Sequence, residues 1–271
     1  MPDGLEAPEP SRRRRFWRRE PRLRHAGAPH APPAAEGAHA PLRVMSWNIH
    51  AGICPAGRYD LNRVIALARR HAPDILALQE VEGRGRAAEA PFRQLCEALG
   101  GHSVEAPTLG TAGPDGAYGH MLISRWPITD AAVHDISCPG REPRAAIAAT
   151  VQAPGGPLRV IAAHFGLRGG ERRFQATKLA ALAKATDLPV LAMGDFNEWS
   201  WRGAVDGALL SVMPGRTRQR TFPVARPLFS LDRIYARPRG LLRRSWTDAA
   251  AREASDHLPV LAEIVLPPPA A

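Results

Sequence analysis

Short apolar runs alternate with amphipathic segments along most of the chain. Leu61–His71 and Pro91–Leu99 carry apolar residues at helical spacing, and the second of these segments stops at Gly100-Gly101. Residues 170–186 predict a third helix by the same criterion. The apolar runs between these segments predict strands at 42–49, 75–79, 121–124, 145–152, 158–164, 189–193, 231–236 and 258–266.

The predicted strands outnumber the predicted helices, and some strands follow one another without a helix between them. The links at Pro154-Gly155-Gly156-Pro157 and at Trp126-Pro127 have the composition of turns. A singly wound parallel sheet would need a crossover, usually a helix, between its strands. The pattern therefore favours an α/β fold in which two packed sheets carry helices on their outer faces.

Residues 1–40 differ from the rest of the chain. They contain an Arg-rich run around Phe16 and Trp17, followed by an Ala/Pro/His/Gly stretch without apolar periodicity. Such a segment cannot bury enough surface to offset its ordering entropy, so we predict a disordered tail over 1–40 and one globular domain over 41–267. The tail either touches phosphates or an anionic bilayer surface, or it is an uninvolved tail or the product of a misassigned start codon.

The charge balance bears on the partner of the protein. The chain has 36 basic and 26 acidic residues among 271, a formal net charge of +10. This excess favours polyanionic partners such as nucleic acid, anionic membranes or phosphorylated substrates, although a general bias toward Arg and Ala explains it equally well.

Three cysteines without CxxC spacing indicate neither a disulfide framework nor a thiolate zinc site. No apolar stretch reaches the length of a membrane span, and the N-terminus lacks the apolar region of a secretory signal. We therefore expect a cytoplasmic protein, and a monomer.

Polar side chains occur where four of the predicted strands begin or end. These positions are Asn48, Glu80, the pair Asp195 and Asn197, and the pair Asp256 and His257. Any one of them is explained equally well by a turn or a cap, but four in one chain favour a shared site. Carboxylates with an amide, and no Cys or paired-His spacing, suit Mg²⁺ (or Mn²⁺) rather than structural zinc.

Seven segments in fixed order resemble the endonuclease/exonuclease/phosphatase superfamily: SWNI, DILALQEVE, LISRWP, AHFGL, GDFNEWS, SLDRIY and ASDHLPV. The resemblance extends over residues 42–266. It implies a four-layered α/β sandwich, with two packed mixed β-sheets flanked by helices and the active site at one edge of the sheets. The globular domain would then be the catalytic domain.

The resemblance also implies roles for individual residues. Glu80 would be the main metal-binding carboxylate, with Asn48 beside it and Asp256 as a further metal ligand. Asp195 would orient or activate the attacking water, and Asn197 would hold a phosphate oxygen.

The remaining roles concern the phosphate and the leaving group. His257 would contact the phosphate or act as a base, oriented by Asp232. His164 would assist the leaving group, and because abasic-site enzymes carry Tyr there, the chain is less similar to them. Arg141 and Arg144 would bind the scissile phosphate, for which a planar guanidinium is well shaped.

The function implied is hydrolysis of phosphodiesters with a divalent metal, with a nuclease-like (endonuclease) activity favoured. The alternatives are a phospholipid or sphingolipid headgroup phosphodiesterase, a phosphatase of the same superfamily, and a catalytically silent binding protein. The last is disfavoured because no metal or base position is missing. Trp199 and Trp201 would either form an apolar wall beside the site or simply pack, and His50 and His71 are assigned to the surface or the core.

Overall fold

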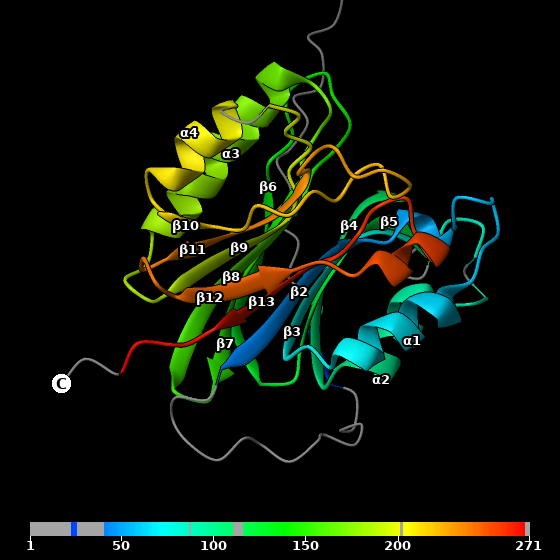
Figure 1. Ribbon diagram of the computed structural model, residues 1–271, viewed down its shortest axis with the longest axis horizontal. Helices are drawn as coiled ribbons and strands as arrows, with labels where there is room; N and C mark the ends of the chain where they lie inside the picture. Colours follow the sequence, from blue (N-terminus) through cyan, green and yellow to red (C-terminus); the bar gives the residue numbers. More distant parts are fainter. Residues whose placement is uncertain (1–22, 26–40, 87, 111–115, 201–202, 269–271) are drawn as a thin grey trace, which may run out of the picture.

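Two β-sheets lie face to face, and helices cover their outer faces (Figure 1). The computed structural model describes residues 23–25, 41–86, 88–110, 116–200 and 203–268. From helix to helix, the layers are helix, sheet, sheet and helix, which confirms the predicted four-layered α/β sandwich.

The first sheet has seven strands and the second has six. In spatial order, the first contains β1 (Leu23–His25), β4 (His102–Gly110), β5 (Ala117–Ser124), β3 (Ile75–Glu82), β2 (Leu42–Asn48), β13 (Val260–Ile264) and β12 (Leu242–Trp246). The second contains β10 (Gly215–Arg216), β11 (Asp232–Arg237), β9 (Val190–Asp195), β8 (Gly156–His164), β7 (Ala145–Ala153) and β6 (Ile128–Asp135). Both sheets are mixed, since β2 and β3 are parallel, β8 and β9 are parallel, and the other neighbours are antiparallel.

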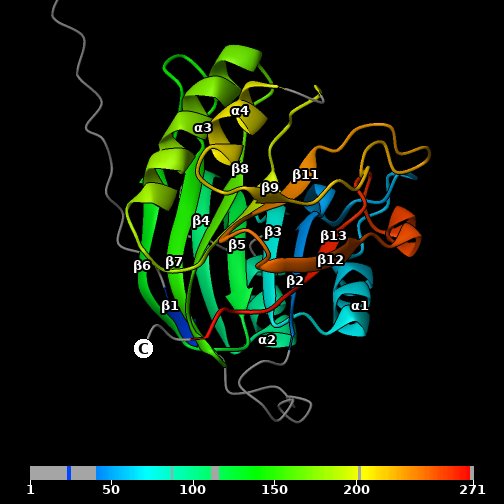
Figure 2. The same cartoon turned by 60° about the vertical axis from the view of Figure 1, so that its left-hand side comes forward.

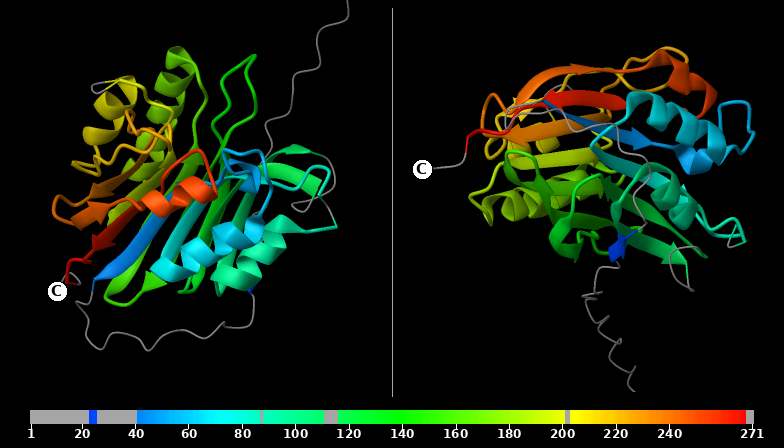
Figure 3. Two further views of the ribbon diagram at one scale, coloured as in Figure 1. Left: turned by 45° about the vertical axis from the view of Figure 1, so that its right-hand side comes forward. Right: turned by 90° about the horizontal axis from the view of Figure 1, so that it is seen from below.

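Each sheet has its own pair of covering helices. Helices α1 (Leu61–His71) and α2 (Pro91–Leu99), with the 3-10 helix η3 (Ala249–Glu253), pack on the outer face of the first sheet (Figure 3). Helices α3 (Gly169–Lys184) and α4 (Ala204–Leu210) lie side by side on the outer face of the second (Figure 2). No described helix is long and apolar enough to cross a membrane.

The main core lies between the sheets. Both inner faces contribute fully buried aliphatic side chains, among them Val44, Leu122, Ile147, Leu191 and Ile234. Because side chains alternate across a strand, the intervening residues face the helices and form two outer clusters. Every strand that carries a site residue is thus buried on both faces, which fixes its position firmly.

Several elements were not predicted from the sequence. The strands β4, β6 and β12 and the short helix α4 are absent from the expected set. Strand β6 is an edge strand with half-exposed residues, and β12 has the polar sequence LRRSW, so neither shows a clear apolar period. Within the tail predicted to be disordered, β1 pairs with the edge strand β4, where unpaired backbone groups are available. The rest of 1–40 lies outside the described residues.

Candidate active site

Strand ends from both sheets meet at one edge of the sandwich. In the first sheet, the parallel strands β2 and β3 pair Asn48 with Gln79 at their C-terminal ends. In the second, the parallel strands β8 and β9 pair His164 with Asp195. Strand β11 runs antiparallel to β9, so Asp232 at its start lies opposite Asp195. The topology therefore gathers polar residues that are far apart in the sequence.

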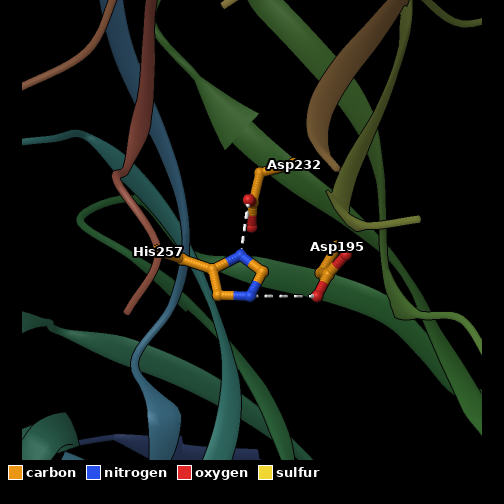
Figure 4. A group of neighbouring side chains, drawn as sticks. All are labelled: Asp195, Asp232 and His257. Atoms are coloured by element: carbon orange, nitrogen blue, oxygen red, sulfur yellow. Dashed lines mark hydrogen bonds and ion pairs between the residues drawn. The ribbon is translucent and has the colours of Figure 1, made fainter. Parts of the chain in front are cut away.

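His257 lies in the loop just before β13 of the first sheet but pairs with a residue of the second. Its Nδ1 lies 2.8 Å from Oδ2 of Asp232, and its Nε2 lies 4.0 Å from Oδ2 of Asp195 (Figure 4). Burial lowers the pKa of His257, but attraction to Asp232, Asp195 and Asp256 outweighs it and raises the pKa to about 10. The ring is therefore protonated at neutral pH, with Nδ1 donating to Asp232 and the Nε2 proton directed toward Asp195.

The loop that carries His257 is fixed by buried hydrogen bonds. The hydroxyl of Ser255 donates to the carbonyl of Asn48 at 2.7 Å and accepts from the backbone N–H of His257 at 3.1 Å. The indole N–H of Trp47 donates to the carbonyl of His257 at 2.9 Å. These bonds tie the loop to the end of β2, so the imidazole reaches across to the second sheet from a rigid base.

Asn48 links the two sheets at the site. Its amide Nδ2 donates to Oε1 of Glu80 at 2.8 Å and to Oδ2 of Asp195 at 3.0 Å. Its Oδ1 accepts from the backbone N–H of His50 at 3.0 Å. Asp195 is fully buried. Its desolvation raises the pKa of its carboxyl, and repulsion from the charge of Asp232 raises that pKa further. The amide thus holds two carboxylates in fixed positions.

Glu80 owes its direction to an irregularity in β3. The pairing of β3 with β5 shifts register between Leu78 and Val81, and Glu80 has a left-handed φ of 57°. Such a bulge turns a side chain out of the regular alternation, here toward the site. Burial raises the pKa of Glu80, but hydrogen bonds from His50 and Asn48 and the charge of His164 outweigh it and bring the pKa to about 2.

His164 lies between the two carboxylates. Its Nε2 lies 3.7 Å from Oδ2 of Asp195 and 3.9 Å from Oε1 of Glu80. Burial lowers the pKa of His164, and the nearby charge of Arg144 lowers it further, while Asp195 acts in the opposite direction. His164 and His257 therefore have pKa values shifted in opposite directions within one site.

The two arginines predicted to bind phosphate differ in position. Arg144 is buried just before the start of β7, where its charge influences His164, and its Nη1 pairs with Glu142 at 2.6 Å. Its Nε is buried and has no hydrogen-bond partner. Arg141 is exposed, and within the described part of the chain no hydrogen bond or ion pair joins its side chain to the site. The structure brings only Arg144 to the site.

Asn197 follows β9 and is held by hydrogen bonds to Asp195 and Phe165. Its N–H donates to Oδ1 of Asp195 at 2.9 Å, and its Nδ2 donates to the carbonyl of Phe165 at 2.8 Å. Its left-handed φ of 49° turns the chain just beyond the strand. These contacts fix the amide of Asn197 beside Asp195.

Sequence reasoning did not identify His50 as a site residue. Its Nδ1 lies 3.5 Å from Oδ1 of Asp256 and 3.7 Å from Oε2 of Glu80. The hydrogen bond with Glu80 raises the pKa of His50 against the effect of burial, and Asp256 raises it further. Its place two residues beyond Asn48, just after the end of β2, was the signal that could have identified it.

The carboxylates of the first sheet suit a hard divalent cation. Oδ1 of Asp256 is buried and accepts no hydrogen bond, and Glu80 keeps a low pKa, so both present anionic oxygens. A second group, Asp195, Asp232 and His257, also brings ligand atoms within 4.8 Å of one another. That group suits a cation less well, because a protonated His257 paired with Asp232 has no free lone pair.

An aromatic wall borders the site beside His257. The ring of Phe222 lies 4.8 Å from the imidazole of His257, and Trp199 packs edge-on against Phe222 and Phe229. Trp199 therefore both packs and lines the site, and 40% of it is exposed. Trp201 lies outside the described residues.

Comparison with known proteins identifies a matching family model and a related protein of similar length. The family model described as "Endonuclease/Exonuclease/phosphatase family" matches residues 45–257. The uncharacterized protein YbhP of Escherichia coli (strain K12) is 31% identical over 252 residues, which cover 83% of this chain and 96% of that protein.

Solved structures show the same fold. An endonuclease/exonuclease/phosphatase from Beutenbergia cavernae superposes with a TM-score of 0.65 at 25% identity, covering 83% of this chain and 72% of that one. A mannosyl-6-phosphatase from Bacteroides thetaiotaomicron superposes with a TM-score of 0.63 at 18% identity, covering 83% and 100%. With a family model that matches most of the chain and strand ends that gather at one edge, the protein belongs to the endonuclease/exonuclease/phosphatase family.

Proposed function

We propose that the protein is a divalent-metal-dependent hydrolase of phosphodiesters. The observation that supports this most is the convergence of Glu80, His164, Asp195, Asp232 and His257 at one edge, linked through the amide of Asn48. Members of the family are hydrolases of phosphoester bonds, and a phosphodiester requires charge neutralisation, an aligned water and a proton for the leaving alkoxide.

The chain's own residues divide these tasks. Asp195 accepts a proton from, or orients, the attacking water, since its buried carboxyl has a raised pKa. Protonated His257 donates from Nε2 to a phosphoryl oxygen, and Asp232 keeps its ring in place. The amide of Asn197 and the guanidinium of Arg144 lie where they can hold further phosphoryl oxygens.

The leaving group and the cation involve the other side of the site. His164, whose lowered pKa leaves the ring neutral, lies close to both carboxylates and is placed to donate a hydrogen bond to the departing oxygen. Glu80, Asp256 and Asn48 would hold Mg²⁺ or Mn²⁺, with His50 beside them. When bound, the cation would neutralise charge that develops on the phosphate.

Two substrate classes fit this chemistry. A nucleic acid, the class that the sequence favours for an endonuclease-like enzyme, fits the net charge of +10. A phospholipid headgroup fits the same charge and also the exposed apolar side chains Leu167, Trp199 and Leu228 around the site. A phosphatase remains a third proposal within the same chemistry.

Hydrolysis of bis-p-nitrophenyl phosphate tests the reaction independently of either natural substrate. We expect turnover with Mg²⁺ or Mn²⁺, none after EDTA, and restoration when the metal is returned. Turnover that persists in EDTA would contradict the metal requirement. Binding of Mn²⁺ without turnover of any phosphoester would instead support a catalytically silent binding protein.

A further inference from the structure

We propose that the loops around the active site form a docking surface for an anionic phospholipid bilayer. The proposal rests on the proposed function, because it assigns the place from which the phosphodiester substrate is taken. The surface consists of an apolar rim (Leu167, Trp199 and Leu228) and of exposed rim arginines (Arg168, Arg218 and Arg226).

All members of the apolar rim lie at the catalytic edge. Leu167 closely follows His164 at the end of β8, and Trp199 closely follows Asn197 after β9. Leu228 shortly precedes the start of β11. Because β8 and β9 are parallel and β11 is antiparallel to both, these three loops leave the sheet on the side where the site lies.

The exposure of these side chains has no explanation in the packing of the fold. Leu167 is 66% exposed, Leu228 46% and Trp199 40%. Phe174 and Leu210 complete the set of exposed large hydrophobic residues in the described part of the chain, so most of that set surrounds the site. Exposed apolar groups gathered around a site indicate an apolar partner rather than random surface composition.

The apolar rim is also pre-ordered. Trp199 is held edge-on by Phe222 and Phe229, and a shallow pocket is lined by Trp199, Leu228, Phe229 and Arg218 among others. A tryptophan fixed in this way loses little side-chain entropy when it enters the interface of a bilayer, where its amphipathic ring is favoured.

The charges around the rim have one sign. Residues 207–231 contain four arginines and no Asp or Glu. After β8, Arg168 at the start of α3 and Arg173 in its first turns are exposed, whereas the acidic residue between them, Glu171, is buried. The exposed surface beside the site thus attracts an anionic partner, and no exposed carboxylate in these segments opposes it.

The combination distinguishes a bilayer from a nucleic acid. Arginines would bind the phosphates of either, and Trp199 could stack on a base. Two exposed leucines gain nothing from a phosphate backbone, but they gain free energy when they enter the apolar part of a lipid interface. The aliphatic members of the rim therefore favour the anionic bilayer.

The test measures co-sedimentation of the full-length protein with vesicles of phosphatidylcholine, with and without phosphatidylglycerol. We expect binding only when the anionic lipid is present. We expect two double variants to bind the anionic vesicles more weakly than the wild type by about tenfold or more: Leu167→Ser/Leu228→Ser and Arg218→Gln/Arg226→Gln. The matched controls are Leu210→Ser, on α4, and Arg239→Gln/Arg243→Gln, at the opposite edge of the sheets. Both controls should bind like the wild type.

The outcomes separate this inference from the proposed function. Turnover of bis-p-nitrophenyl phosphate should be unchanged in all four variants, since that ester needs no surface, and circular dichroism checks their folding. The inference is overturned if the wild type does not bind the anionic vesicles, or if the rim variants bind them as tightly as their controls. It is also overturned if the same variants lose binding to single- or double-stranded DNA but not to vesicles. Vesicle binding without turnover would refute the proposed function alone.

Discussion

The two sides of the candidate active site differ in how far their side chains are exposed to solvent. The side from the first sheet (Asn48, His50, Glu80 and Asp256) is partly open, with side-chain exposures of 44% for His50, 24% for Glu80 and 32% for Asp256. The side from the second sheet (His164, Asp195, Asn197 and Asp232) is closed, with 7% for His164, 2% for Asp195 and 0% for Asp232.

Backbone conformation and unpaired oxygens do not separate the two sides. Left-handed φ values occur at His50, Ala51 and Glu80 on the open side and at Asn197 on the closed side, and Oδ1 of Asp256 and Oδ1 of Asp232 are both buried without a hydrogen-bond partner. On the closed side, Asp195 accepts hydrogen bonds on both oxygens, and Asp232 pairs with His257. The difference is therefore one of exposure: an open side suits exchange of water and cations, whereas a closed side suits fixed positions for proton transfer.

The largest effect is expected on the closed side. Asp195→Asn keeps the shape of the side chain but removes the carboxylate that we propose acts on the attacking water, so kcat on bis-p-nitrophenyl phosphate should fall by about 10³. Asp130→Asn, at an exposed carboxylate far from the site, is the control. A loss of less than about tenfold would show that Asp195 does not act on the water.

Asp232→Asn should reduce stability as well as turnover. It breaks a buried ion pair, so we expect the free energy of unfolding to fall by about 3 kcal/mol at neutral pH. The pKa of His257 is raised to about 10 in the folded protein, compared with about 6.5 in the unfolded chain. The ion pair therefore stabilises the fold fully below about pH 6.5, and this stabilisation is lost as the pH rises through about 10. Urea unfolding in EDTA should therefore show a difference from wild type that shrinks between about pH 6.5 and about pH 10.

A pH-independent difference between Asp232→Asn and wild type would contradict the charged pair. The corresponding carboxylate-to-amide substitution on the open side provides the comparison of stability. Glu80→Gln should lower the free energy of unfolding less than Asp232→Asn does, because the side chain of Glu80 is 24% exposed and that of Asp232 is fully buried.

The third effect concerns the metal. Glu80→Gln and Asp256→Asn should each weaken Mn²⁺ binding by about 10- to 100-fold, whereas Asp232→Asn should weaken it much less. Calorimetric titration of Mn²⁺ measures this. Equal losses of Mn²⁺ affinity from all three substitutions would indicate that the cation also contacts the group of Asp195, Asp232 and His257. The cation site would then not be confined to the open side.

The smallest effect distinguishes the two arginines. Arg144→Gln should raise KM for bis-p-nitrophenyl phosphate by about tenfold, because its buried guanidinium lies near His164. Arg141→Gln, exposed on the same segment, should change KM by less than about twofold. The reverse order would mean that the segment moves when substrate binds.

The sequence predicted the helices Leu61–His71 and Pro91–Leu99 with the bounds that the structure shows. It also predicted most of the buried strands, within a few residues at their ends. The edge strands β6 and β12 were missed, because half-exposed strands carry little apolar periodicity. The roles of the site residues stay predictions that the experiments above address.

The sequence by itself determined which polar residues stand at strand ends, because strand periodicity and turn composition are local properties. Only the tertiary structure decided which of them meet. The bulge that turns Glu80, the crossing of His257 to Asp232, and the place of His50 between two carboxylates depend on strand pairing over long sequence separations. The separation of Arg144 from Arg141 was also decided there, because burial is a property of the packed sheets and not of the local segment.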